Sequence, residues 1–179
     1  MLKQEYPYYL ANEAVYANTD LKVYDKYNGE LATAVPLATP EVLDQAIAAA
    51  CDAADAMAAA LDGAKAFACN VTDSESIEAA VADVKAALGE IDILVNSAGI
   101  VDLAPAEELS KAAWDHTIAV NLTGTYLMCQ AVGRAMISAG KGGRIVNLAS
   151  QAGSVAIEGH VAYCATKFAL EGMAEALAE

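Results

Sequence analysis

From residue 64 onward, continuous apolar runs alternate with segments of helical periodicity. Short continuous apolar runs, which are typical of strands buried in a parallel sheet, cover residues 64–69, 91–95 and 144–148. Between them, apolar residues spaced three and four apart predict helices. The predicted helices cover residues 74–88, residues 111–139 and a segment from His160 to the end of the chain. Strands that alternate with helices in this way indicate an α/β fold with a parallel sheet.

The first third of the chain has a different pattern. Extended stretches at residues 21–25 and 31–37 flank Asn28-Gly29, a pair that tolerates the positive φ of a tight hairpin turn. Thr39-Pro40-Glu41 then predicts a helix start, with Thr as the N-cap and Pro at the first helical position. The alanine-rich run that follows ends at Asp62-Gly63. We therefore expect a hairpin-plus-helix appendage at residues 1–61 and an α/β domain at residues 62–179.

Composition narrows the function classes. The 179 residues are 56% hydrophobic, which is typical of a globular protein, and the formal net charge is −14. This charge argues against nucleic acid and against an anionic membrane surface, because both require clustered Lys and Arg. No apolar run is long enough to span a bilayer, and the opening residues do not resemble a signal peptide, so we expect a cytoplasmic protein.

The cysteines show no metal-binding spacing. No CxxC pair occurs, and each cysteine falls within a predicted helix or strand. We therefore expect core or near-core thiols in a reducing compartment, and no metal site. The four are Cys51, Cys69, Cys129 and Cys164.

Small polar loops follow two of the predicted strands. Residues 96–99 (NSAG) and 149–153 (ASQAG) lie where parallel strands end, and ligands of open α/β sheets bind at that edge. Small residues there would let a ligand approach the backbone closely. Either loop alone would also serve as an ordinary turn.

Tyr163 and Lys167 provide a stronger chemical signal. They are four residues apart on a predicted helix and therefore share one face. A phenol ordinarily has a pKa of about 10, and a neighbouring ammonium favours the phenolate, which suits a tyrosine to proton transfer. Ser150 would supply a hydroxyl that holds the reacting oxygen beside the phenol. A Tyr–Lys pair at this spacing also occurs on ordinary surface helices, but its combination with Ser150 and the NSAG turn favours a catalytic site.

Five motifs occur in the order and spacing of the short-chain dehydrogenase/reductase family, which the chain resembles from about residue 63 onward. They are CNVTD at 69–73, ILVNSAG at 93–99, NLTG at 121–124, RIVNLAS at 144–150 and YCATK at 163–167. The resemblance implies a Rossmann-like sheet and an oxidoreductase that transfers hydride between NAD or NADP and an alcohol or carbonyl group, with polyols and sugars among the candidate substrates. It also implies a homo-oligomer, because the two long helices of this family often pair between subunits.

The resemblance also assigns roles to individual residues. Tyr163 is expected to be the general acid/base, and Lys167 to tune it and hold the nicotinamide ribose. Ser150 is expected to orient the substrate and Asn121 to hold a relay water. Further cofactor contacts are expected from Asn70, Val71, Asn96, Ala98 and Gly99. Gln151 and His160 are substrate-contact candidates, although a turn role for Gln151 and a helix-start role for His160 are alternatives.

The chain departs from the family pattern in several places. Ser97 stands where a second Asn is usual, and Asn70 where Asp is usual. No TGxxxGxG turn precedes residue 96, the family's second strand has no counterpart, and the sequence stops at Glu179 within the helix that bears Tyr163. We therefore expect an incomplete Rossmann-like parallel sheet that is truncated or rearranged, and a complete seven-stranded sheet would contradict this expectation.

A second resemblance concerns residues 20–60, which look like the opening hairpin and first helix of the aldehyde dehydrogenase family, without that family's catalytic cysteine. This predicts a fusion of two incomplete segments joined near residues 58–64. Two functions stay open at this point. One is an NAD(P)-dependent oxidoreductase, and the other is a catalytically inactive, truncated fragment that acts at most as an oligomerisation module.

Overall fold

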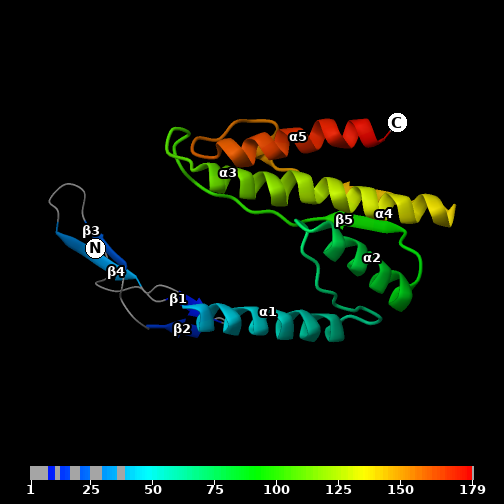
Figure 1. Ribbon diagram of the computed structural model, residues 1–179, viewed down its shortest axis with the longest axis horizontal. Helices are drawn as coiled ribbons and strands as arrows, with labels where there is room; N and C mark the ends of the chain where they lie inside the picture. The colour runs from blue at the N-terminus through cyan, green and yellow to red at the C-terminus, as the bar shows by residue number, and fades with distance from the viewer. Residues whose placement is uncertain (1–7, 11–12, 17–20, 25–29, 36–38, 179) are drawn as a thin grey trace. The chain divides into compact units, whose positions relative to one another are not determined.

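The computed structural model describes residues 8–10, 13–16, 21–24, 30–35 and 39–178. The chain divides into two compact units, residues 1–66 and 67–179, and each is described by itself. Figure 1 shows the elements of both units.

The first unit contains two antiparallel hairpins and a helix. Strands β1 (Tyr8–Leu10) and β2 (Glu13–Val15) form one hairpin, and β3 (Leu21–Tyr24) and β4 (Leu31–Val35) form the other. The second hairpin is the one that we predicted, and its Asn28-Gly29 turn lies outside the described residues. The first hairpin was not predicted, because strands of three residues are too short to show a period-2 pattern.

Helix α1 (Pro40–Ala60) begins where its capping residues predict. Thr39 accepts a hydrogen bond on Oγ1 from the backbone N–H of Val42 at 3.4 Å, and Pro40 occupies the first turn. Cys51 and Met57 on this helix are exposed. The expectation of a core thiol at Cys51 is therefore wrong, because Cys51 lies on a part of α1 where most residues are exposed.

The second unit alternates helices with two strands. Helix α2 (Ser74–Leu88) precedes β5 (Ile93–Asn96), and β6 (Arg144–Asn147) precedes α5 (Val161–Leu177). A long helical stretch between the strands comprises α3 (Lys111–Ile118), a π-helical segment η1 (Ala119–Gly124) and α4 (Thr125–Ala139). A short 3₁₀ turn, η2 (Gln151–Gly153), follows β6. These elements confirm the predicted α/β class.

Strands β5 and β6 form a two-stranded parallel sheet, in which Ile93 lies opposite Arg144 and Asn96 opposite Asn147. The prediction of a strand at residues 64–69 is wrong. This segment forms no helix or strand, and Cys69 is exposed rather than buried. A strand requires a ladder of hydrogen bonds with a neighbour, and no strand of the described residues pairs with this segment. Among the described residues this sheet has two strands, which agrees with the incomplete parallel sheet that we expected.

The core of the second unit lies on one face of this sheet. Leu94 of β5 packs there against residues from α2 and α4. Because successive side chains of a strand point to opposite faces, its neighbours Ile93 and Val95 are 64% and 55% exposed. The buried cluster consists of Ile77, Val81, Leu94, Ala131, Val132 and Met136.

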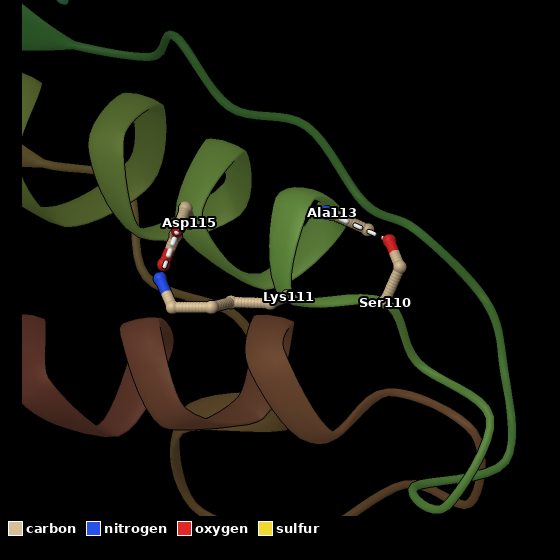
Figure 2. Close-up of polar contacts among 4 residues, drawn as sticks. All are labelled: Ser110, Lys111, Ala113 and Asp115. Carbon is tan, nitrogen blue, oxygen red and sulfur yellow. Dashed lines mark hydrogen bonds and ion pairs between the residues drawn. The ribbon is translucent and has the colours of Figure 1, made fainter.

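The long helical stretch begins with a polar cap and contains a π-helical turn. Ser110 accepts a hydrogen bond on Oγ from the N–H of Ala113 at 3.1 Å, and Lys111 forms an ion pair with Asp115 one turn later (Figure 2). We predicted one helix over residues 111–139, and the chain is helical over all of it. The π-helical turn from Ala119 to Gly124 was not predicted.

Figure 1 shows α5 lying alongside the start of this helical stretch, and contacts between α3 and α5 agree with that view. The arrangement brings the first turns of α5 next to the π segment, which α5 also contacts. Of the helices in the described residues, none is long and apolar enough to cross a membrane.

Candidate active site

Three elements meet at the predicted site: the loop after β5, the π segment and α5. A Cβ atom added to Gly99 would lie 3.6 Å from Asn121 Oδ1 and 3.9 Å from Lys167 Nζ. Gly99 itself is exposed, whereas Asn121 and Lys167 are buried. The fold therefore places these three residues together, although they come from distant parts of the sequence.

Lys167 is held by contacts with Leu148, the residue after β6, and with Tyr163. Its side chain is 6% exposed, and Nζ donates a hydrogen bond to the carbonyl oxygen of Leu148 at 2.8 Å. The same atom lies 5.5 Å from the centroid of the Tyr163 ring, one helical turn away. Such partners offset the cost of removing a buried ammonium from water.

Asn121 connects the loop after β5 to the helices. Its Oδ1 accepts from the N–H of Ile100 at 2.8 Å, and its Nδ2 donates to the carbonyl oxygen of Ile100 at 2.8 Å. Nδ2 also donates to Thr166 Oγ1 at 3.3 Å. Both Nδ2 hydrogens therefore have protein acceptors, and a relay water would have to bind through another atom.

Ser150 reaches the site from the end of β6. Its Oγ accepts a hydrogen bond from the N–H of Ala152 at 3.2 Å and caps the η2 turn. Within the described residues, no hydrogen bond joins Ser150 to Tyr163, and both side chains are half-buried. The η2 turn packs closely on α5, since a Cβ on Gly153 would lie 2.9 Å from the carbonyl oxygen of Lys167.

Asn96 faces the interior. Its Nδ2 donates to Asn147 Oδ1 at 2.9 Å and to Cys129 Sγ at 3.3 Å. Asn96 therefore links β5, β6 and α4, while Ala98 and Gly99 in the loop beyond it are exposed. Burial raises the pKa of the Cys129 thiol, and the contacts with Asn147 and Asn96 offset part of that rise.

Asn70 and Val71 lie before α2. The side-chain oxygen of Asn70 accepts from the N–H and the hydroxyl of Thr72, at 3.0 and 2.8 Å, in a local turn. Val71 packs against the π segment, because a Cβ on Gly124 would lie 2.9 Å from the carbonyl oxygen of Val71. Asn70 is exposed, and its expected contact with the cofactor stays a prediction.

The two substrate-contact candidates have different surroundings. The His160 ring packs edge-on against the Tyr163 ring with centroids 6.3 Å apart, and its Nδ1 lies 2.7 Å from the carbonyl oxygen of Glu158. Gln151 is exposed at the start of η2.

Sequence reasoning missed Thr166. Its hydroxyl is fully buried, donates to the carbonyl oxygen of Tyr163 at 2.7 Å and accepts from Asn121. The only signal in the sequence was its position immediately before Lys167. Among the described residues, no group of three or more His, Cys, Asp or Glu side chains could hold a metal ion.

Comparison with known proteins places this site in a family context. A family model described as short chain dehydrogenase matches residues 31–179. The chain is 60% identical over 106 residues to D-threitol dehydrogenase of Mycolicibacterium smegmatis, a match that covers 59% of this chain and 40% of that protein. It is 50% identical over 107 residues to an NAD-dependent glycerol dehydrogenase of Listeria innocua, covering 60% of this chain and 42% of that protein.

A solved structure is also similar. The gluconate 5-dehydrogenase of Burkholderia cenocepacia, in complex with NADP and tartrate, matches with a TM-score of 0.55 and 37% identity, over 57% of this chain and 40% of that one. The chain thus spans about two-fifths of the length of the relatives that it matches. The family match begins at residue 31, and no comparison supports the resemblance of residues 20–60 to aldehyde dehydrogenases.

Proposed function

The chain belongs to the short chain dehydrogenase family, and on that premise we propose that it is an NAD(P)-dependent oxidoreductase acting on a polyol or sugar. The names of two relatives support this substrate class, since one is a D-threitol dehydrogenase and the other a glycerol dehydrogenase. A cytoplasmic location and a homo-oligomeric state are further parts of the proposal.

The residues around Gly99 fit the nicotinamide end of a cofactor. The absence of a side chain at Gly99 leaves space beside Lys167 Nζ, which a Cβ would approach to 3.9 Å. An ammonium held there by the Leu148 carbonyl can donate to ribose hydroxyl groups, and Ala98 and Gly99 expose backbone to a ligand. The bound nicotinamide would supply or accept the hydride. NAD and NADP are both candidates.

Tyr163 is proposed as the general acid/base. Its phenolate form would take the proton of a substrate alcohol during oxidation, and the resulting phenol would give that proton to the carbonyl oxygen during reduction. Lys167, whose Nζ lies 5.5 Å from the Tyr163 ring centroid, would stabilise the negative charge that develops on the phenol oxygen. Ser150, half-buried at the end of β6, would hold the substrate oxygen between its hydroxyl and that of Tyr163.

Two further residues are proposed to contact the substrate. His160 packs against the Tyr163 ring, and its Nδ1–H is expected to donate to the Glu158 carbonyl oxygen at 2.7 Å. Nε2 of this neutral tautomer is an acceptor, which suits a second hydroxyl of a polyol. Gln151, exposed beside Ser150, would donate a hydrogen bond to a further hydroxyl of the polyol.

The observation that carries the proposal is the position of Lys167, buried and held between the Leu148 carbonyl and Tyr163. The test is turnover of threitol, glycerol and sorbitol with NAD or NADP, followed by absorbance of the reduced nicotinamide. Tyr163→Phe should lower kcat by about 10²- to 10⁴-fold, the usual contribution of general acid–base catalysis.

Tyr126→Phe is the matched control. Tyr126 is an exposed tyrosine on α4, where its hydroxyl accepts a hydrogen bond from Gln130, and its loss should leave turnover unchanged. If the purified protein turns over none of these substrates and does not change the fluorescence of either reduced cofactor at saturating concentration, the proposal fails in favour of an inactive fragment.

A further inference from the structure

Thr166 is one of several buried polar side chains in the second unit, and its hydrogen bonds connect two elements of the site. Its exposed fraction is 0%. A hydroxyl buried this deeply is costly unless it is hydrogen-bonded. Thr166 Oγ1 donates to the carbonyl oxygen of Tyr163 on its own helix and accepts from Asn121 Nδ2 on the π segment.

The contact with Asn121 extends to the loop after β5. The Asn121 amide bonds both the N–H and the carbonyl oxygen of Ile100, each at 2.8 Å. Ile100 follows Gly99, the residue next to Lys167 Nζ. A continuous chain of hydrogen bonds therefore runs from this loop through Asn121 and Thr166 to the backbone of Tyr163.

We infer that Thr166 is a positioning residue, which holds the loop at Gly99 and Ile100 in register with the helix turn that bears Tyr163 and Lys167. It touches neither the proposed substrate nor the proposed cofactor, so it acts through Asn121 and the Tyr163 backbone. Its effect on catalysis rests on the proposed function, whereas its effect on the loop does not.

Thr117 offers a matched control within the same unit. Its side chain is also 0% exposed, but its hydroxyl has no hydrogen-bond partner among the described residues. Thr117→Val and Thr166→Val both replace a buried hydroxyl with a methyl group and keep the branched shape of the side chain. Only Thr166→Val removes a hydroxyl that has hydrogen-bond partners. Thr166→Ser keeps the hydroxyl and tests for rescue.

The primary measurement is amide hydrogen exchange by NMR. In Thr166→Val, exchange of the Ile100 N–H, which donates to Asn121 Oδ1, should accelerate about three- to tenfold, the value of one hydrogen bond. Exchange of the Leu148 N–H, which bonds the Asn96 carbonyl in the sheet, should change by less than about twofold. Thr117→Val and Thr166→Ser should leave both amides near their original rates. If the valine variant does not fold, Thr166→Ala removes the hydroxyl without bulk and takes its place.

Kinetics provide the second measurement. Thr166→Val should lower kcat by about tenfold with a change in substrate KM below about threefold, and Thr166→Ser should restore kcat. The inference is overturned if Ile100 exchanges alike in the Thr166→Val and Thr117→Val variants, or if serine does not rescue it. If the exchange result is as expected but the parent protein neither turns over the substrates nor changes the fluorescence of either reduced cofactor, the positioning role stands and the proposed function fails.

Discussion

At the scale of single residues, the environment of Cys129 predicts that the stability of the protein falls as the pH rises in the alkaline range. The thiol is 3% exposed between Asn96 and Asn147, and burial raises its pKa above the ordinary value of 9.0. A thiol whose pKa is higher in the folded state than in the unfolded state contributes stability that is fully present below the unfolded-state pKa. That stability is lost as the pH rises from there through the folded-state pKa.

We therefore predict that the free energy of unfolding falls with pH above about 9 more steeply in the parent protein than in Cys129→Ser, by at most about 1.4 kcal/mol per pH unit. Urea unfolding followed by circular dichroism at about pH 8, 9 and 10 measures the difference. Cys51→Ser, which changes an exposed thiol, should keep the slope of the parent protein. Equal slopes for the Cys129→Ser and Cys51→Ser variants would show that the buried thiol does not titrate differently on folding.

Some site residues could be predicted from spacing and others could not. Tyr163 and Lys167 were predictable because a four-residue spacing fixes a shared helix face. Asn96 was predictable as a strand-end residue, but its turn toward Cys129 depends on how α4 packs under the sheet. Spacing could not predict a role for Thr166, because that role depends on a hydrogen bond with Asn121, 45 positions away.

At the scale of elements, the π segment depends on close backbone contact. A Cβ on Gly124 would lie 2.9 Å from the carbonyl oxygen of Val71 and 3.0 Å from the Val71 Cβ, closer than Cβ atoms approach such groups. The backbone at residue 71 or the π segment must shift to accommodate a methyl group there. We predict that Gly124→Ala destabilises the protein by about 1–3 kcal/mol, the range for overpacking.

Gly133→Ala tests the same substitution without the contact. Gly133 lies within α4, and a Cβ there would meet nothing within 4 Å. It should stabilise the protein by about 0.5–1 kcal/mol, because alanine favours a helix interior over glycine. Urea unfolding of both variants decides the point, and a Gly124→Ala variant as stable as Gly133→Ala would contradict the close packing at Val71.

Helix ends were the most predictable elements, since local signals determine them. Thr39 caps α1, and Gly89, with a φ of +93°, ends α2. The π segment has no such signal, because residues 119–124 would also fit an ordinary α-helix. The strand expected at residues 64–69 had the right composition, but pairing requires a neighbouring strand, which composition does not reveal.

At the scale of the whole molecule, the family match and the structural division fall in different places. The match begins at residue 31, within the first unit, whereas the compact units divide after Ala66. The motifs that predicted the family all lie in the second unit, which accounts for the later start expected from sequence. The fold class was predictable from the alternation of strands and helices.

This division predicts where a protease cuts first. Lys65 is exposed and lies between α1 and α2 in a segment without helix or strand, whereas most other basic residues from 39 to 178 lie in or next to helices and strands. Trypsin requires a locally unfolded stretch, which such a segment provides at low cost. Within residues 39–178, the first cut should therefore follow Lys65 and release a fragment that begins at Ala66.

Mass spectrometry of a limited digest identifies this fragment, and Lys65→Gln should slow its appearance at least about tenfold if Lys65 is the main site. The released fragment contains the whole core cluster of the second unit, so it should unfold cooperatively in urea. A first cut within α2, α4 or α5 would contradict the division, because it would mean that the helices of the second unit open more readily than the segment that precedes them. A fragment that is digested as fast as it forms would likewise show that residues 67–179 do not fold without the first unit.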